Sequence, residues 1–155
     1  MSPSSAVFRA ALAGALLLLP ALATSGADEA VIDVPAETPL YATLVEATRA
    51  AVAAELQQPV ALEVTLLRTQ GDFAFLAARV QQPDGAPIDF RATVYDAAIA
   101  AGLFDGPQLW AFLQNSAGEW QVIEHDIGPT DAWFFGWPSA HGVSCAVLGD
   151  GISNC

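Results

Sequence analysis

The spacing of hydrophobic and polar positions after residue 38 predicts a helix. From residue 39 to about residue 57, apolar side chains recur every three or four positions, which is the period of an amphipathic helix. Thr38 is suited to cap this helix, Pro39 fits its first position, and Pro59 ends it. The stripe consists of Tyr41, Leu44, Val45, Thr48, Val52 and Leu56.

Two β-hairpins are predicted further along the chain. Residues 60–68 alternate apolar and polar positions, and residues 73–81 return as a second, more apolar strand after a turn at 69–72. The second hairpin joins residues 108–114 to residues 120–127. Between the hairpins lie a turn-rich loop, a stretch at 88–93 that is either a short edge strand or simply extended, and a short helix at about 94–101.

This order of elements predicts an α+β fold. We expect one long helix packed on a curved antiparallel sheet of about four strands, followed by a disulfide-tied C-terminal tail. The second and third strands are apolar on both faces, so the face away from the helix also needs a cover. The candidates are the short helix, the aromatic residues near the C-terminus and a second copy of the chain.

The N-terminal segment has the order of residues found in a secretory signal. Arg9 precedes an apolar run at 10–19, and small residues follow Pro20. The run is shorter than the roughly 20 residues that a membrane-spanning helix needs. We therefore expect residues 1–27 to be a signal peptide, cleaved before Thr24 or Asp28, and residues 28–155 to form one exported domain in the periplasm or outside the cell.

Charge narrows the range of partners. The chain carries a formal charge of −12, and all five of its basic residues are arginines. A surface of this sign repels phosphate backbones and anionic lipid headgroups. We therefore expect no nucleic-acid partner, and no membrane association once the signal is removed.

The two cysteines stand close together near the C-terminus. Cys145 and Cys155 are ten positions apart, and an exported protein meets oxidising conditions. The spacing does not match the C-x-x-C pattern of redox-active pairs. We therefore predict a structural disulfide that closes a short C-terminal loop.

Three segments resemble a known group of proteins. They are residues 66–76, residues 120–124 and residues 127–131, the last followed by Trp133 and by Trp137-Pro138. Together they resemble a family of small exported bacterial proteins of uncharacterised function, over roughly residues 44–142. The resemblance implies a cystatin-like or NTF2-like arrangement, in which a curved antiparallel sheet wraps a helix, and it implies no catalytic residues.

The densest group of polar residues is Glu124-His125-Asp126, with Asp131 shortly after it. A histidine beside carboxylates suits general acid–base chemistry. Side chains alternate along a strand, however, so Glu124 and Asp126 share one face and His125 takes the other. The competing interpretation, which we favour, is that the acids are solvated at a strand end and that Asp131 caps a turn.

No metal site or cofactor is predicted. A zinc site could be drawn from His125, His141 and Asp131, but the two histidines are far apart in the sequence and neither has a recognisable ligand spacing. The serines lack a nucleophile elbow, and the glycines fit no phosphate-binding loop.

An aromatic group gives the best indication of function. It comprises Trp133, Phe134, Phe135 and Trp137, and aromatic side chains are enriched in binding sites. In an extended segment Trp133, Phe135 and Trp137 share one face and become buried, which leaves Phe134 exposed. The competing interpretation is that the whole group is core covering the sheet.

We therefore expect an exported binding module without catalytic activity. Its ligand is a partner protein, a small apolar molecule or a second copy of the chain, held by the aromatic group. The alternative hypothesis is an NTF2-like enzyme that uses His125 or a nearby carboxylate, Glu124 or Asp131, as acid or base.

Overall fold

The computed structural model describes residues 29–155. The predicted signal peptide and both predicted cleavage sites lie outside the described residues. The helix α1 spans Pro39–Leu56, and its cap is the predicted one, since Thr38 Oγ1 accepts a hydrogen bond from the backbone N–H of Tyr41 at 3.2 Å. Gln57 ends the helix in a left-handed conformation. Four residues of the predicted apolar stripe on α1 are buried: Leu44, Thr48, Val52 and Leu56.

Five antiparallel strands form one sheet in the order β1-β2-β3-β4-β5. They are β1 (Ile32–Asp33), β2 (Ala61–Gln70), β3 (Phe73–Gln81), β4 (Gln108–Ser116) and β5 (Glu119–Ile127). The expectation of about four strands is therefore corrected to five. The additional strand, β1, has only two residues, too few to show an alternating pattern.

The expectation of one long helix is corrected as well. The helical part comprises the 18-residue α1 together with short segments, among them α2 (Asp96–Ala100) and α3 (Trp137–Ala140). The stretch at 88–93 contains the 3₁₀ helix η2 (Phe90–Ala92) and forms no named strand. Asp89 accounts for this turn, because its carboxylate accepts the backbone N–H of Arg91.

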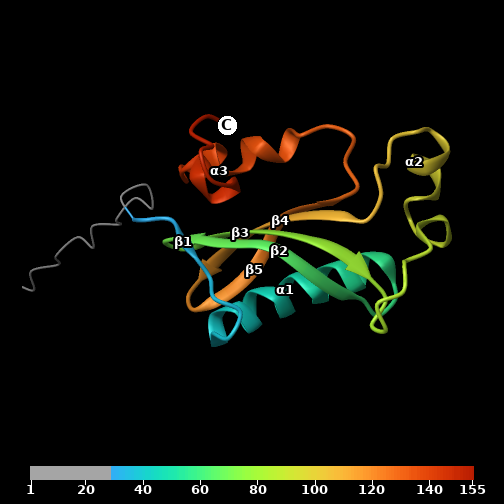
Figure 1. Cartoon of the computed structure of the whole chain (residues 1–155), viewed down its shortest axis with the longest axis horizontal. Coiled ribbons are helices and arrows are strands. Elements are labelled where there is room, and N and C mark those ends of the chain that lie inside the picture. Colours follow the sequence, from blue (N-terminus) through green and yellow to red (C-terminus); the bar gives the residue numbers. More distant parts are fainter. Residues whose placement is uncertain (1–28) are drawn as a thin grey trace, which may run out of the picture.

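The sheet is covered on both faces (Figure 1). The helix α1 lies against one face, and α3 with the C-terminal segment lies against the other. Alternate residues of β4 divide between two clusters, since Leu109 joins the cluster on the α1 side and Phe112 joins the cluster on the tail side. Of the covers that the sequence left open, the aromatic C-terminal segment is the one that closes the far face.

The aromatic segment is helical, and this overturns one prediction. Residues Trp133–Gly136 form the 3₁₀ helix η3, which runs directly into α3. Helical spacing directs Phe134 and Trp137, three positions apart, into the core, where they are 7% and 3% exposed. Trp133 points outward and is 53% exposed. The prediction that Phe134 is exposed and Trp133 buried is wrong, because it assumed an extended chain.

The predicted disulfide between Cys145 and Cys155 is present, with 5.6 Å between the two Cα atoms. Its loop includes the 3₁₀ helix η4 (Cys145–Leu148), and η4 places Val147 and Leu148 in the cluster on the tail side. The disulfide therefore closes a loop that contributes to the core as well as to the chain end.

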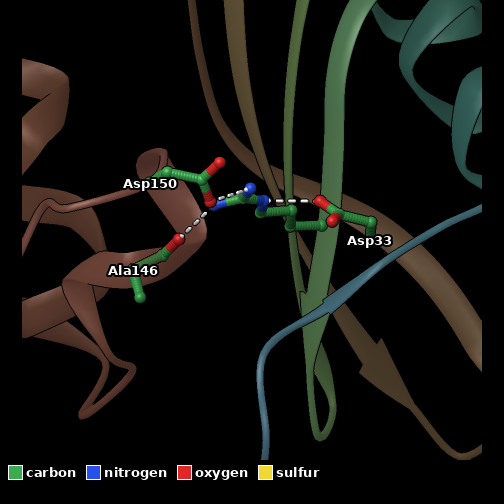
Figure 2. Close-up of polar contacts among 4 residues, drawn as sticks. Asp33, Ala146 and Asp150 are labelled. Carbon is green, nitrogen blue, oxygen red and sulfur yellow. Dashed lines mark hydrogen bonds and ion pairs between the residues drawn. The ribbon is translucent and has the colours of Figure 1, made fainter.

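Arg68 in β2 joins both ends of the described chain (Figure 2). Its guanidinium donates to Asp33 Oδ1 at 2.6 Å, to Asp150 Oδ1 at 2.5 Å and to the carbonyl oxygen of Ala146 at 2.9 Å. Only 10% of the arginine side chain is exposed, whereas both carboxylates face solvent. We assign this cluster a structural role, because its one cation already has two anionic partners.

Removing the disulfide is expected to destabilise the fold without abolishing it. For a loop of this length, the chain-entropy model gives about 2–3 kcal/mol of stabilisation. Urea unfolding of the oxidised protein and of a Cys145→Ser/Cys155→Ser variant measures this difference. The reduced wild-type protein is the control and should match the variant. Identical midpoints for the oxidised protein and the variant would contradict this expectation.

Candidate functional site

A polar cluster lies where the C-terminal end of α1 meets β5. His125 Nε2 is 2.5 Å from Glu55 Oε2, and the Tyr95 hydroxyl donates a hydrogen bond to Glu55 Oε1 at 2.6 Å. The three residues come from β5, from α1 and from the segment just before α2. Through Glu55, the segment that connects the two hairpins is hydrogen-bonded to α1.

Hydrogen bonding and burial set the protonation of this cluster. The hydrogen bond to His125 is the main cause that holds the pKa of Glu55 below its usual value, with a further contribution from Tyr95. Burial and the bond to Glu55 raise the pKa of Tyr95. At neutral pH, Glu55 is therefore ionised and Tyr95 is a protonated donor.

The neighbours of His125 in β5 reach the other face of the sheet, as strand alternation predicted. Asp126 Oδ2 accepts a hydrogen bond from the indole Nε1–H of Trp133 at 3.1 Å. Glu124 Oε1 lies 3.4 Å from His141 Nε2. The predicted group Glu124-His125-Asp126 is therefore split between the two faces and does not converge on one point.

Asp131 is exposed on the loop that leaves β5. In the described part of the chain, no hydrogen bond to its carboxylate supports the predicted turn cap. It does line an open cleft together with Asp126 and Trp133, near the end of β5.

This cleft, which we call the Trp133 cleft, has a volume of about 330 Å³. It lies between the loop that leaves β5 and the segment around α2. Leu103 and Trp133 line it and are 63% and 53% exposed. The full lining is Tyr95, Ala98, Leu103, Asp126, Ile127, Gly128, Pro129, Thr130, Asp131 and Trp133. Apolar walls and two carboxylates therefore meet in one cleft.

Trp133 is held in place although it is exposed. Its indole N–H is bonded to Asp126, and its ring meets the buried ring of Trp137 edge to face, with 5.2 Å between centroids. Trp137 is anchored in the cluster on the tail side. The exposed ring is therefore preorganised, which reduces the entropy lost when a ligand binds.

Gly128 shapes the floor of the Trp133 cleft. Its φ of 63° is left-handed, and a Cβ there would lie 2.5 Å from the carbonyl oxygen of Gly106 and 2.7 Å from the ring of Phe104. Its backbone N–H donates to Gln108, and its carbonyl oxygen accepts from Asp105. Glycine at this position lets the loop before β4 and the loop after β5 come into contact.

A second open cleft, of about 530 Å³, adjoins the other side of the polar cluster. Glu55, Thr93 and Val94 are among its lining residues, whereas His125 lines neither cleft. Within residues 29–155, no group of three or more histidines, cysteines or acids is placed to hold a metal ion. The same residues include no helix long and apolar enough to cross a membrane.

Sequence reasoning missed Glu55 and Tyr95. Glu55 follows Val52 by three positions, so it borders the buried stripe of α1, and a carboxylate at such a position is a usable signal. Tyr95 gave no such signal. Its partner lies 40 residues away in the sequence, and only the folded chain brings the two together.

Comparison with known proteins gives no family assignment. No protein-family model, no curated protein and no solved structure matches the chain significantly. The interpretation of the site therefore depends on its geometry.

The ionisation of Glu55 predicts a pH-dependent contribution to stability. Because its pKa is lowered in the folded state, this contribution is present above the ordinary glutamate value, about pH 4.3, and is lost as the pH falls through the lowered pKa. Urea unfolding of Glu55→Gln should show lower stability than wild type at pH 7 and a smaller gap at pH 3. Glu119→Gln, at an exposed position, is the control. A gap that does not change with pH would contradict this assignment.

Proposed function

We propose that the protein is an exported binding module without catalytic activity, and that its ligand site is the Trp133 cleft. The observation that carries this proposal is an indole ring that is 53% exposed and yet fixed by Asp126 and Trp137. The exposed ring of Trp133 does not stand alone, because the exposed side chain of Leu103 lines the same cleft, and adjoining exposed apolar groups are typical of binding sites. Ligand sites typically combine apolar walls with a few polar groups, as this cleft does.

The site differs from the one that the aromatic group suggested. Phe134 and Trp137 belong to the core, so Trp133 is the member of that group that remains available to a ligand. Leu103 takes the role of a second apolar wall. Its exposed fraction of 63% makes it one of the most exposed large apolar side chains among the described residues.

Two further aspects of the proposal concern architecture and location. The order strand, helix and four-stranded meander, with α1 on one face of the sheet, supports a cystatin-like or NTF2-like arrangement. The Cys145–Cys155 disulfide supports an oxidising compartment, either the periplasm or the cell exterior. The signal-like order of residues 1–27 supports export to it.

The alternative is an NTF2-like enzyme that uses His125 as a general base. The short contact between His125 and Glu55 favours it, because a carboxylate that orients a histidine is a recurrent catalytic pair. The position of His125 weighs against it, since this residue lines neither cleft. We therefore prefer the binding module.

A neutral apolar dye tests the proposed site. The fluorescence of 1-N-phenylnaphthylamine rises when it enters an apolar cleft, so wild-type protein should enhance it saturably. Trp133→Ala and Leu103→Ser should each weaken binding about tenfold, the effect of losing roughly 1.4 kcal/mol. Ile32→Ser is the matched control, because Ile32 is equally exposed, at 60%, but lies in β1. Equal losses in Leu103→Ser and Ile32→Ser would contradict the site.

A further inference from the structure

The Trp133 cleft carries negative charge that its own lining does not neutralise. Asp126 and Asp131 both line it, and its lining contains no arginine or histidine. Glu55, which is ionised at neutral pH, lies behind the Tyr95 wall and is hydrogen-bonded to it. The hydrogen bonds to the Asp126 carboxylate come from neutral donors, the indole N–H of Trp133 and the backbone N–H of Ile127. A ligand with a positive group would supply the missing counter-charge.

The aromatic wall favours the same kind of ligand. The hydrogen-bond donor of Trp133 is used by Asp126, so the ring offers a ligand mainly its π surface. An ammonium or guanidinium group is attracted to the face of an indole, and tryptophan is the best of the aromatic residues for this contact. Carboxylates beside the ring add to that attraction.

Size and net charge favour a small ligand of positive charge. A volume of about 330 Å³ lies at the lower end of the range for small-ligand sites. A second copy of this chain would bring another net charge of −12 to an acidic surface. An anionic ligand would meet the two carboxylates directly.

We propose that the Trp133 cleft binds a small organic cation, in which an ammonium or guanidinium group is attached to an aromatic or branched apolar group. The apolar part packs on Leu103 and Trp133, and the cation lies between the indole ring and the carboxylates of Asp126 and Asp131. This inference depends on the proposed binding function and adds the chemical class of the ligand.

Three phenyl probes of similar size and different charge test the proposal. They are 2-phenylethylammonium, neutral 2-phenylethanol and anionic 3-phenylpropanoate, each titrated into the full chain by calorimetry at physiological salt. The ammonium should bind about tenfold more tightly than the alcohol, and the anion should not bind. Asp126→Asn and Asp131→Asn should each weaken the ammonium severalfold and leave the alcohol unchanged. Asparagine keeps an oxygen to accept the Trp133 N–H, so the ring stays in place.

The possible results distinguish failure of the charge inference from failure of the proposed binding function. If ammonium and alcohol bind equally and Asp126→Asn changes neither, the charge inference is overturned while the binding site stands. If no probe binds, or if Trp133→Ala weakens the binding of none of them, the charge inference and the proposed binding site are both overturned. Glu119→Gln removes an acid at the start of β5 and is the control for general charge. An equal loss of ammonium binding in Glu119→Gln would show diffuse attraction to the surface and would overturn the inference.

Discussion

Replacing Phe134 with alanine is expected to lower the free energy of unfolding by about 3–5 kcal/mol. The ring is 7% exposed and stacks on Trp110 with 4.4 Å between centroids, and it also contacts Phe75 and Trp137. Removing it leaves a cavity between the sheet and the aromatic segment, and the neighbouring rings cannot collapse far enough to fill it. Urea unfolding followed by circular dichroism measures the loss.

Trp133→Ala is the matched control for Phe134→Ala. The two residues are adjacent in η3, but Trp133 is 53% exposed, so its removal should cost under about 1 kcal/mol. Phe134→Ala should therefore lose more stability than Trp133→Ala. In an extended segment, where Trp133 would be buried and Phe134 exposed, the order would be reversed. A larger loss for Trp133→Ala than for Phe134→Ala would therefore contradict the helical arrangement.

Gly128→Ala is expected to cost about 2–5 kcal/mol and to abolish binding in the Trp133 cleft. The left-handed backbone adds about 1–2 kcal/mol for any residue with a Cβ. The new Cβ would also lie 2.5 Å from the backbone oxygen of Gly106, and such overpacking typically costs 1–3 kcal/mol. Relief requires the loops before β4 and after β5 to separate, and this opens the floor of the cleft.

Gly142→Ala separates the two contributions. Gly142 has a similar φ of 69°, but an added Cβ would have no atom within 4 Å. Its loss should therefore reflect backbone strain alone, about 1–2 kcal/mol. Equal losses at Gly128 and Gly142, measured by thermal and urea unfolding, would show that the contact with Gly106 is unimportant.

Much of the fold could be predicted because it follows local periodicity. The helix α1 and the strands β2 to β5 have regular apolar spacing, and each lies within a few residues of its predicted range. The disulfide followed from the short spacing of Cys145 and Cys155 and from the expected compartment. The strand β1 has two residues and is defined only by its pairing with β2, so no local pattern reveals it.

The aromatic segment was misinterpreted for a physical reason. Four aromatic side chains in five positions fit a strand and a helix equally well, and alternation was assumed. The informative residue was Pro138, because proline is favoured in the first turn of a helix and occupies that place in α3. A helical segment that continues into α3 places Phe134 and Trp137 on one face and leaves Trp133 outside it.

The candidate site depends on tertiary contacts more than the fold does. His125 was recognised from the sequence, but its partner Glu55 lies 70 residues away. The cleft itself forms only when the segment around α2 meets the loop that leaves β5. Neither segment has a periodic pattern, so the sequence shows the aromatic and acidic residues without showing that they meet.

The most direct test of the Trp133 cleft as the ligand site is an NMR titration of the ¹⁵N-labelled protein with 2-phenylethylammonium. The chain has four tryptophans, so four indole N–H signals report on four places in the fold. We expect saturable shifts of the Trp133 indole and of the Leu103 and Gly128 amides, with no shift of the Trp120 indole. Saturable shifts centred away from these residues, or none at all, would contradict the account.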